Sequence, residues 1–257
     1  MDFTIFGNYL AMEVIAIIPA RSGSKSIIDK NIINLNGHPL LAFSIAAAKL
    51  STQIDRIIVS TDSEDYAIIA RKYGAEVPFI RPKEISTDSC IDRDFLIHAI
   101  EWLESNEKNC PEFWVHLRPT TPIRDPKVLD RAVNVFLNNN IATSLRSGHK
   151  APESPLKWFT KNNEGYFESI LSNTYKNEAY NLPKEEFEDI YIPNGYIDIL
   201  KKSFLENNKE IHGGKILAFE SPVCTEVDSV DELKYIQYQL QNSEYPILEY
   251  LNSLSLN

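Results

Sequence analysis

The feature that most constrains the fold is an unbroken apolar run at residues 14–18, VIAII, which Pro19 ends. Such a run is typical of a strand that is buried on both faces, as in a parallel sheet covered by helices on either side. A polar loop follows, then a helical pattern at residues 39–48 and a second apolar strand at residues 56–60. This order of elements predicts a βαβ unit.

The alternation of strand and helix continues after this unit. Ser63 is placed to cap a helix that runs to Tyr73, Gly74 stands where that helix ends, and residues 77–80 predict a short strand. Chains that alternate in this way form an α/β fold, and we expect a doubly wound, mostly parallel sheet. The remaining elements are expected as helices at 92–105, 126–138 and 229–241 and as strands at 113–117, 190–192, 196–200 and 215–219.

The pattern also divides the chain. The α/β domain takes residues 13–147 and 191–242, and an insertion at 148–190 interrupts it. In that insertion Pro, Glu, Asn and aromatic residues are mixed without a period, which fits an arm that packs on a partner subunit. Residues 243–257 are expected as a C-terminal tail. Residues 1–12 are interpreted as a disordered extension, or as residues before an alternative translation start.

Composition and charge argue against several classes of function. Of the 257 residues, 43% are hydrophobic, which is enough for a sizeable core. The formal net charge is -10 and the Lys and Arg residues form no run, which argues against a nucleic-acid binder. No apolar stretch is long enough to span a bilayer, so we expect a cytoplasmic protein without a membrane segment. The odd number of cysteines also fits a reducing compartment; they are Cys90, Cys110 and Cys224.

The most informative segment is the loop after the first strand, residues 20–25 with the sequence ARSGSK. The carboxyl ends of strands form the ligand crevice of a doubly wound sheet, so this loop is placed to meet a ligand. Its small residues expose N–H groups and hydroxyls, and Arg21 and Lys25 supply positive charge, which together suit a polyphosphate. The spacing matches neither the P-loop nor the G-x-G-x-x-G fingerprint, which argues against P-loop hydrolases and dinucleotide oxidoreductases. The alternative is a solvated turn.

At this loop the sequence resembles a known family. The segment IPARSGSK at 18–25, followed by Lys30 and Asn31, resembles the nucleotide loop of the CMP-acylneuraminate synthetases, cytidylyltransferases that activate sialic acid and its bacterial relatives. The resemblance extends over residues 14–241 and implies a Rossmann-like nucleotidyltransferase fold with a dimerisation and sugar-binding arm. Further segments that carry it, in the family's order, are STD at 60–62, RPKEISTD at 81–88, RPTTPIR at 118–124, NGYID at 194–198 and EVD at 226–228.

The resemblance implies a CTP site on this loop. Lys25 is the best candidate to stabilise the charge that grows on the α-phosphate and the departing pyrophosphate, because a fixed cation acts strongly in a partly dehydrated cleft. Arg21 would assist it. Arg81 would donate to the acceptor edge of cytosine, or else be a surface residue, and Asp92 lies near a position that often offers a hydroxyl to the base. The residues expected to hold the nucleotide are Arg21, Ser22, Gly23, Ser24, Lys25, Asn31, Arg81 and Asp92.

Two carboxylates near the C-terminus form the candidate metal site. Glu226 and Asp228 alternate along an extended segment, so both face one side and can share a cation. They match the paired acidic metal ligands of the family, with Glu in place of the first Asp. The resemblance therefore implies Mg²⁺ as the cofactor and Asp228 as a catalytic residue beside Lys25 and Arg21. The alternative for Asp228 is a cap of the last helix.

For the acceptor, the resemblance points to the arm. Lys157 and Lys184 align with positions that approach the sugar, where a cation would hold its carboxylate. Lys184 stands where many members carry Arg and Glu185 where they carry Gln, so a bidentate grip becomes a point charge. Ser26 and Arg118 also depart from the family, which commonly has Gly and Gln there. The residues expected to bind the sugar are Lys157, Lys184 and Asn194.

Two classes of function follow. The first is an enzyme that joins CTP to a sialic-acid-like ulosonic acid for cell-surface polysaccharide, by direct attack of the anomeric hydroxyl on the α-phosphate. Its acceptor is open between sialic, legionaminic, pseudaminic and octulosonic acids. The second is a non-catalytic nucleotide-binding regulator, which the departures at Ser26, Lys184 and Glu226 motivate. The arm's resemblance implies a homodimer with two-fold symmetry, in which the partner completes each sugar site.

Overall fold

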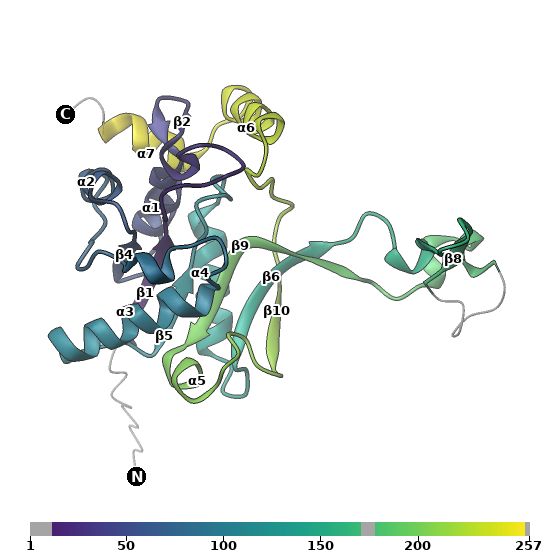
Figure 1. The fold of residues 1–257 in the computed structure, drawn as a ribbon, viewed down its shortest axis with the longest axis horizontal. Helices are drawn as coiled ribbons and strands as arrows, with labels where there is room; N and C mark the ends of the chain where they lie inside the picture. The colour runs from purple at the N-terminus through teal and green to yellow at the C-terminus, as the bar shows by residue number, and fades with distance from the viewer. Residues whose placement is uncertain (1–11, 171–177, 255–257) are drawn as a thin grey trace, which may run out of the picture.

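A computed structural model describes residues 12–170 and 178–254 of the chain, so the predicted N-terminal extension lies outside it except for Met12. The centre of the fold is a six-stranded sheet in the order β10-β6-β9-β5-β1-β4 (Figure 1). β9 is antiparallel to both neighbours and the other pairings are parallel, which confirms the mostly parallel sheet. The strands are β1 (Val14–Pro19), β4 (Arg56–Ser60), β5 (Phe113–His116), β6 (Ser144–Lys150), β9 (Tyr191–Lys201) and β10 (Ile216–Glu220).

The side chains of β1 show why the sheet is covered on both faces. Val14, Ala16 and Ile18 belong to one hydrophobic cluster, and Ile15 and Ile17 belong to another. Each of these residues is at most 1% exposed. The strand therefore appears in the sequence as an unbroken apolar run and not as an alternation of polar and apolar residues.

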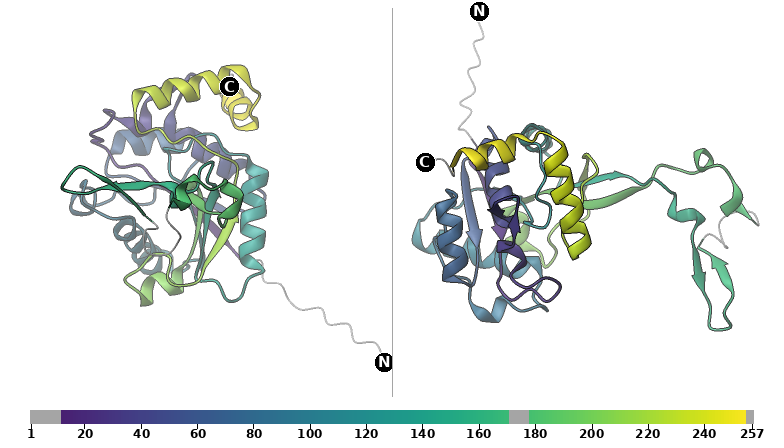
Figure 2. Two further views of the ribbon diagram at one scale, coloured as in Figure 1. Left: turned by 90° about the vertical axis from the view of Figure 1, so that its right-hand side faces the viewer. Right: turned by 90° about the horizontal axis from the view of Figure 1, so that it is seen from above.

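The larger cluster lies between one face of the sheet and most of the helices. α1 is almost entirely buried and packs against β1, α4 and α7 (Figure 2). A short hairpin leads into it, with Asn36 and Gly37 at φ 48° and 90° in the turn, as a tight two-residue hairpin requires. These elements are β2 (Asn34–Leu35), β3 (His38–Pro39), α1 (Leu40–Leu50), α2 (Glu64–Lys72), α4 (Pro126–Leu137), α6 (Val230–Asn242) and α7 (Pro246–Leu254).

The smaller cluster lies on the opposite face, under α3 (Asp92–Asn106) and α5 (Lys202–Asn207). Leu96 and Leu103 of α3 and Leu205 of α5 pack there with side chains of β1. Helices thus cover both faces, which confirms the doubly wound arrangement (Figure 1). None of the helices in the described ranges is long and apolar enough to cross a bilayer.

The predicted strand at residues 77–80 is wrong. The only sheet-like pairing near it is an isolated bridge between Ile58 and Glu76. Pro78 has no N–H to give to a ladder, and the carbonyl of Val77 accepts a hydrogen bond from Arg71 Nη2 at 3.0 Å. The segment therefore runs as irregular chain from α2 toward the cavity described below.

The region expected as a C-terminal tail contains α7. Ile247 and Leu251 lie four residues apart on one face of this helix, and both are fully buried. They belong to the same hydrophobic cluster as α1. This part of the chain therefore completes the core and is not an appendage.

The insertion forms an arm that projects far from the body (Figures 1 and 2). β6 and β9 continue beyond the sheet as a two-stranded ribbon, in which Lys150 pairs with Tyr191. The ribbon leads to a small antiparallel hairpin of β7 (Phe159–Lys161) and β8 (Phe167–Ser169). Residues 171–177 lie outside the described part of the arm.

Candidate active site

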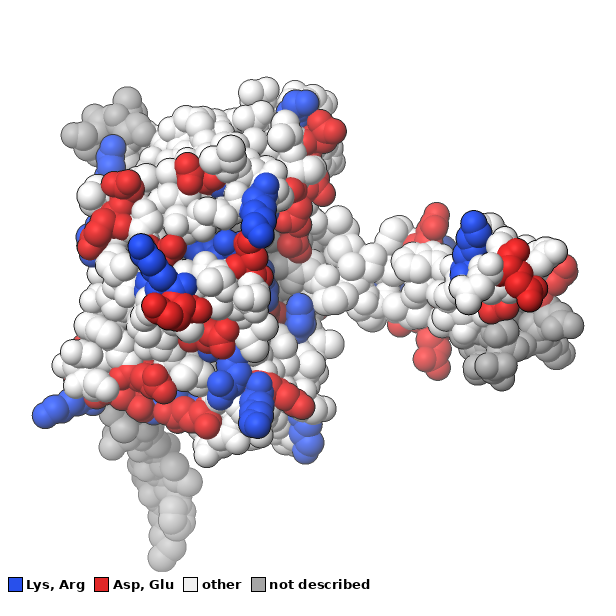
Figure 3. All heavy atoms as spheres, in the orientation of Figure 1, with Lys and Arg blue, Asp and Glu red and all other residues white. Residues whose placement is uncertain are grey.

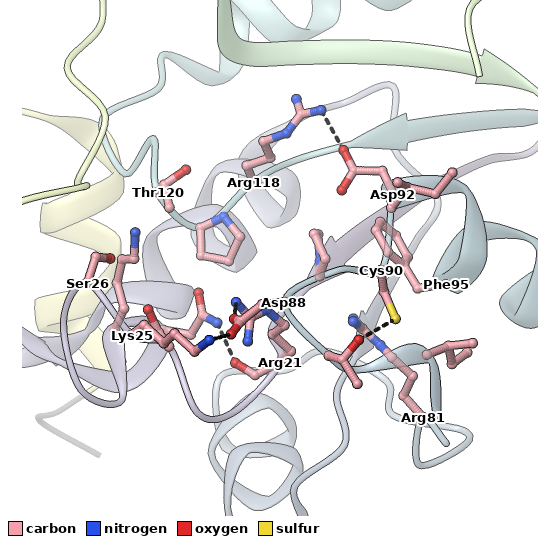
Figure 4. A pocket seen from close by; sticks show the side chains of 18 residues that line it. Arg21, Lys25, Ser26, Arg81, Asp88, Cys90, Asp92, Phe95, Arg118 and Thr120 are labelled. Atoms are coloured by element: carbon pink, nitrogen blue, oxygen red, sulfur yellow. Dashed lines mark hydrogen bonds and ion pairs between the residues drawn. The ribbon is translucent and has the colours of Figure 1, made fainter. Parts of the chain in front are cut away.

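A cavity of about 420 Å³ opens at the carboxyl ends of β1 and β5 (Figure 4). Pro19, which ends β1, and residues 118–120, which follow β5, line one part of it. The loop after β1 and residues 85–95 supply most of the remaining wall. The ligand crevice of a doubly wound sheet is expected at this edge.

The loop after β1 brings two cations to one carboxylate. Arg21 Nη2 lies 2.5 Å from Oδ1 of Asp88, and Lys25 Nζ lies 2.6 Å from its Oδ2. The hydrogen bond from Lys25, and next the one from Arg21, lower the pKa of Asp88. A phosphate group, like this carboxylate, has negatively charged oxygens, which can accept hydrogen bonds from the same N–H donors. The arrangement is therefore suited to an anionic ligand.

Polar contacts behind the loop fix its shape. Ser22 donates its N–H and its hydroxyl to the carboxylate of Asp62, at 2.7 and 2.8 Å. Asn31 Nδ2 donates to the carbonyl oxygen of Arg21 at 2.9 Å. Gly23 has a φ of 68°, a conformation that glycine adopts without strain. Ser22 and Asn31 thus support the loop, and Asn31 also lines the cavity with Arg21, Ser24 and Lys25.

Arg81 lines the cavity and is buried, so the surface alternative is wrong. Its Nε and Nη2 donate to the hydroxyl and carbonyl oxygens of Ser60, at 3.0 and 2.5 Å. The guanidinium carbon lies 4.9 Å from the ring centroid of Phe95. Burial lowers the pKa of Arg81 to about 10, so it still carries its charge at neutral pH.

A cluster of charges around a buried aspartate lies beside the cavity, and sequence reasoning missed it. Arg118 lines the cavity and bridges Asp92 and Asp198, at 2.8 and 2.7 Å. Asp198 is on β9 and fully buried, and Arg146 Nε lies 3.7 Å from its other oxygen. His116, at the end of β5, also faces Asp198. Asp92, expected as a nucleotide-binding residue, therefore reaches the cavity but is paired with a cation of the chain.

The two candidate metal ligands lie on the segment before α6. The chain alternates there around Val227, which is fully buried. Glu226 Oε1 accepts a hydrogen bond from the N–H of Gly195 at 2.8 Å, and Asp228 Oδ1 pairs with Lys30 Nζ at 2.9 Å. Lys30 also lines the cavity, so it connects Asp228 to the cavity's edge.

Asp228 does not cap α6, the helix expected at residues 229–241, so that alternative is wrong. The N-cap of α6 is Ser229, whose hydroxyl accepts a hydrogen bond from the N–H of Glu232 at 3.3 Å. The Glu232 carboxylate accepts in turn from the N–H groups of Asp228 and Ser229. This capping box holds the backbone at Asp228 and leaves its carboxylate to Lys30.

The predicted sugar-binding residues do not reach the cavity within one chain. Lys157 Nζ donates to the carbonyl oxygen of Leu182 on the arm, at 2.8 Å. Lys184 lines a separate cavity of about 130 Å³, together with Glu185. Asn194 is buried in β9, where its Oδ1 accepts from the hydroxyl of Ser147 at 2.8 Å. Its contacts within the chain are those of a residue that holds strands together.

The positive charge available to a polyphosphate is local. Figure 3 shows Lys and Arg side chains interspersed with Asp and Glu over the visible face of the body and the arm. At the cavity, by contrast, Arg21, Lys25 and Lys30 of one loop all line the wall. Figure 4 shows Arg21 and Lys25 on either side of Asp88. An acidic chain can therefore present a cationic site to an acidic ligand.

No cluster of three or more His, Cys, Asp and Glu side chains suited to a metal occurs in residues 12–170 and 178–254.

Comparison with known proteins identifies the family. The family model described as Cytidylyltransferase matches residues 15–202, which include the loop after β1, Arg81 and the cluster around Arg118. This chain belongs to the cytidylyltransferase family. The expectation drawn from the resemblance is confirmed at this level.

Individual relatives of this chain are named for different sugar acids. An N-acylneuraminate cytidylyltransferase of Escherichia coli O18:K1:H7 (strain RS218 / NMEC) is 30% identical over 226 residues, which are 87% of this chain and 50% of that protein. A pseudaminic acid cytidylyltransferase of Campylobacter jejuni serotype O:23/36 is 33% identical over 177 residues, which are 67% of this chain and 74% of that protein. The chain thus spans about half the length of the N-acylneuraminate relatives it matches.

A solved structure of similar fold supports the architecture. It is described as a CMP:2-keto-3-deoxy-manno-octonic acid synthetase complexed with CTP, and it superposes with a TM-score of 0.67. The match covers 90% of this chain and 99% of that chain, at 15% sequence identity. This chain therefore shares its fold with that structure.

Proposed function

We propose that this chain transfers CMP from CTP to a sialic-acid-like ulosonic acid and releases pyrophosphate. Family membership supports cytidylyl transfer, and the relatives are named for N-acylneuraminate, pseudaminic acid and N,N'-diacetyllegionaminic acid. One observation carries the proposal. Arg21 and Lys25 lie 2.5 and 2.6 Å from a single carboxylate, in a cavity at the carboxyl ends of β1 and β5.

In this proposal the phosphates of CTP bind between Arg21 and Lys25. The anomeric hydroxyl oxygen of the acceptor attacks the α-phosphorus and releases its proton to solvent, and the bond from that phosphorus to the oxygen bridging toward the β-phosphate breaks. Negative charge grows on the departing pyrophosphate, where nearby cations stabilise it. The Lys25 side chain is 82% exposed at the mouth of the cavity, so it can follow the leaving group. Arg21, which is more buried, holds the α-phosphate in place.

Glu226 and Asp228 suit a divalent cation at the edge of this site. Within the described residues, Glu226 Oε2 and Asp228 Oδ2 are not engaged in hydrogen bonds or ion pairs, whereas the other oxygen of each carboxylate is. Carboxylate oxygens are the protein ligands that Mg²⁺ prefers. When bound, Mg²⁺ would neutralise charge on the phosphates. Lys30 adds a fixed positive charge at the same place and orients Asp228.

The acceptor site, in this proposal, is completed by the arm of a second chain. Lys157 and Lys184 are carried by the arm, which projects away from the body that holds the cavity (Figure 1). Apolar side chains exposed on the arm support pairing of two chains, since such patches mark interaction sites. Trp158, Tyr166 and Phe167 are 51%, 68% and 74% exposed. A two-fold dimer would then bring each arm to the partner's cavity.

Pyrophosphate release from CTP and Mg²⁺, measured with sialic, legionaminic, pseudaminic and octulosonic acids, tests the function. We expect release with one of these acceptors. Lys25→Ala and Asp228→Ala should each lower the rate by roughly 10²–10³-fold, the usual cost of losing a group that stabilises transition-state charge. Lys72→Ala is the matched control, because Lys72 is exposed on α2 away from the cavity. Tight CTP binding without release from any acceptor would contradict transfer and support a non-catalytic regulator.

A further inference from the structure

The cavity is closed on one side by a strap, which we define as residues 83–91. The strap contains a short 3₁₀ helix, η2 (Lys83–Ile85), and the turn that leads into α3. Most of its residues are exposed, yet Asp88 and Cys90 line the cavity opposite the loop after β1. The strap is therefore a thin wall between the cavity and solvent.

The strap is held mainly by hydrogen bonds to its own neighbourhood. Ser86 Oγ donates to the carbonyl of Pro82 at 2.8 Å, and Cys90 Sγ donates to the carbonyl of Glu84 at 3.3 Å. The N–H of Ile91 donates to the Asp94 carboxylate at 3.0 Å. As far as the described chain shows, Asp88 alone joins the strap by hydrogen bonds or ion pairs to a segment outside residues 82–94. Its partners are the two cations of the loop, as Figure 4 shows.

These two cations are the ones that the proposed function assigns to the triphosphate. Asp88 uses one oxygen for Arg21 and the other for Lys25, at 2.5 and 2.6 Å. Phosphate oxygens that bind the same N–H donors would have to enter beside this carboxylate. Like charges at such separations repel each other, and each N–H group donates to one acceptor at short distance. Bound triphosphate and Asp88 therefore compete for these two cations.

We propose that Asp88 is an internal competitor of CTP, which pairs with Arg21 and Lys25 until the triphosphate binds and displaces it. The proposal rests on the proposed function, because it takes CTP as the ligand of this cavity. Its consequence for the strap is direct. Once Asp88 leaves the two cations, the strap loses its link to the loop, and residues 86–91 gain freedom when the nucleotide is bound.

The competitor lowers affinity for the nucleotide. Asp88→Asn removes a negative charge next to the phosphates and weakens the two ion pairs that CTP must break. Partly exposed ion pairs contribute modestly, so we expect the Kd of CTP to fall by roughly two- to tenfold. Inorganic triphosphate should show the same change, because the competition concerns the phosphates and not the base.

Titration calorimetry of CTP and of inorganic triphosphate, with the wild-type chain and Asp88→Asn, tests the proposal. Glu84→Gln is the matched control, since it removes the same charge from the same strap without touching Arg21 or Lys25. We expect tighter binding of both ligands in Asp88→Asn and a nearly unchanged Kd in Glu84→Gln. Unchanged or weaker binding in Asp88→Asn would overturn the proposal, because Asp88 would then only position the cations. Absence of triphosphate binding in both proteins would overturn it as well.

Hydrogen exchange of the wild-type chain gives a second readout that needs no variant. Amides of residues 86–91 should exchange faster with CTP bound than without it, and unchanged or slower exchange would count against displacement. These results are separate from transfer activity. Suppose that Asp88→Asn binds CTP more tightly but that the wild-type chain releases no pyrophosphate with any acceptor. Competition by Asp88 would then be supported, and the proposed transfer function would be contradicted.

Discussion

At the residue scale, the charges around the cavity occur in pairs whose members are far apart in sequence. Arg118 and Asp198 are separated by 80 positions and Arg21 and Asp88 by 67. The position of Arg21 and Lys25 at the cavity was predictable from the sequence, because a strand end in this fold faces the crevice. It could not assign their partners, since pairing across such distances depends on strand order. The acidic residues were nevertheless present in the RPKEISTD and NGYID segments that carry the resemblance.

His116 offers a test of this charge cluster through pH. Burial, and next the positive charge of Arg118, lower the pKa of His116 to about 4, against the opposing effect of Asp92 and Asp198. An unfolded histidine titrates near pH 6.5. Between that pH and about pH 4 the unfolded chain therefore binds a proton at this histidine that the folded chain does not bind. Stability from this group is full above about pH 6.5 and is lost as the pH falls toward 4.

We therefore expect the free energy of unfolding to fall on the order of 2 kcal/mol more in the wild type than in His116→Asn between about pH 7 and pH 5. Urea unfolding at the two pH values measures this difference. Both proteins contain the same carboxylates, so the titration of these groups does not contribute to the difference between wild type and variant. Parallel loss of stability in the two proteins would show that His116 titrates normally in the fold.

At the scale of elements, strands and helices were predicted correctly where the pattern of apolar residues is uninterrupted. β1 and β4 appeared as apolar runs because both of their faces are buried, and α2 was delimited by Ser63 and Gly74. The long β9 was read as two shorter strands, because Pro193 and Gly195 interrupt the apolar pattern in its middle. Its register against β6 shifts between Arg146 and Gly148, opposite that interruption. Such a shift depends on the neighbouring strand and has no local signal.

The irregular point in β9 requires a glycine. A Cβ on Gly195 would lie 2.5 Å from Oγ1 of Thr121 and 3.2 Å from Oε1 of Glu226. Gly195→Ala should therefore lower the free energy of unfolding by about 1–3 kcal/mol, the usual cost of overpacking. It should also reduce Mg²⁺-dependent turnover in the surviving folded protein, because it pushes Glu226 from its place.

Gly214→Ala is the control for this prediction, because a Cβ there meets no atom within 4 Å. We expect its unfolding free energy to stay within about 0.5 kcal/mol of the wild type. Chemical denaturation followed by tryptophan fluorescence compares both variants. Equal stability of Gly195→Ala and Gly214→Ala would contradict the prediction, because the segment around Thr121 would then move to accept the Cβ at little cost.

At the scale of the whole molecule, the arm is the feature that one chain alone does not explain. It carries Lys157 and Lys184 away from the cavity, and its hairpin exposes Phe167 at 74%. Loss of the strand and helix rhythm in the sequence was enough to predict an insertion there. The direction in which the arm projects was not predictable, because it follows from the extension of β6 and β9 beyond the sheet.

If two chains pair through the arm, Phe167→Asp should convert a dimer into a monomer. A buried charge without a partner is costly at an interface. Transfer to the sugar should fall with dimerisation, while CTP binding persists, because the nucleotide site lies in the body. Ile68→Asp, which changes an exposed side chain on α2, should remain dimeric. Sedimentation velocity and turnover together decide this, and a fully active wild-type monomer would contradict the shared site.

The central claim is that the cavity joins CMP to a sugar acid and does not merely bind or hydrolyse the nucleotide. Phosphorus NMR of a reaction with CTP, Mg²⁺ and each ulosonic acid follows both products directly. We predict equal amounts of pyrophosphate and a new phosphodiester with one acceptor. Unchanged CTP, or CMP and pyrophosphate without the phosphodiester, would contradict the account.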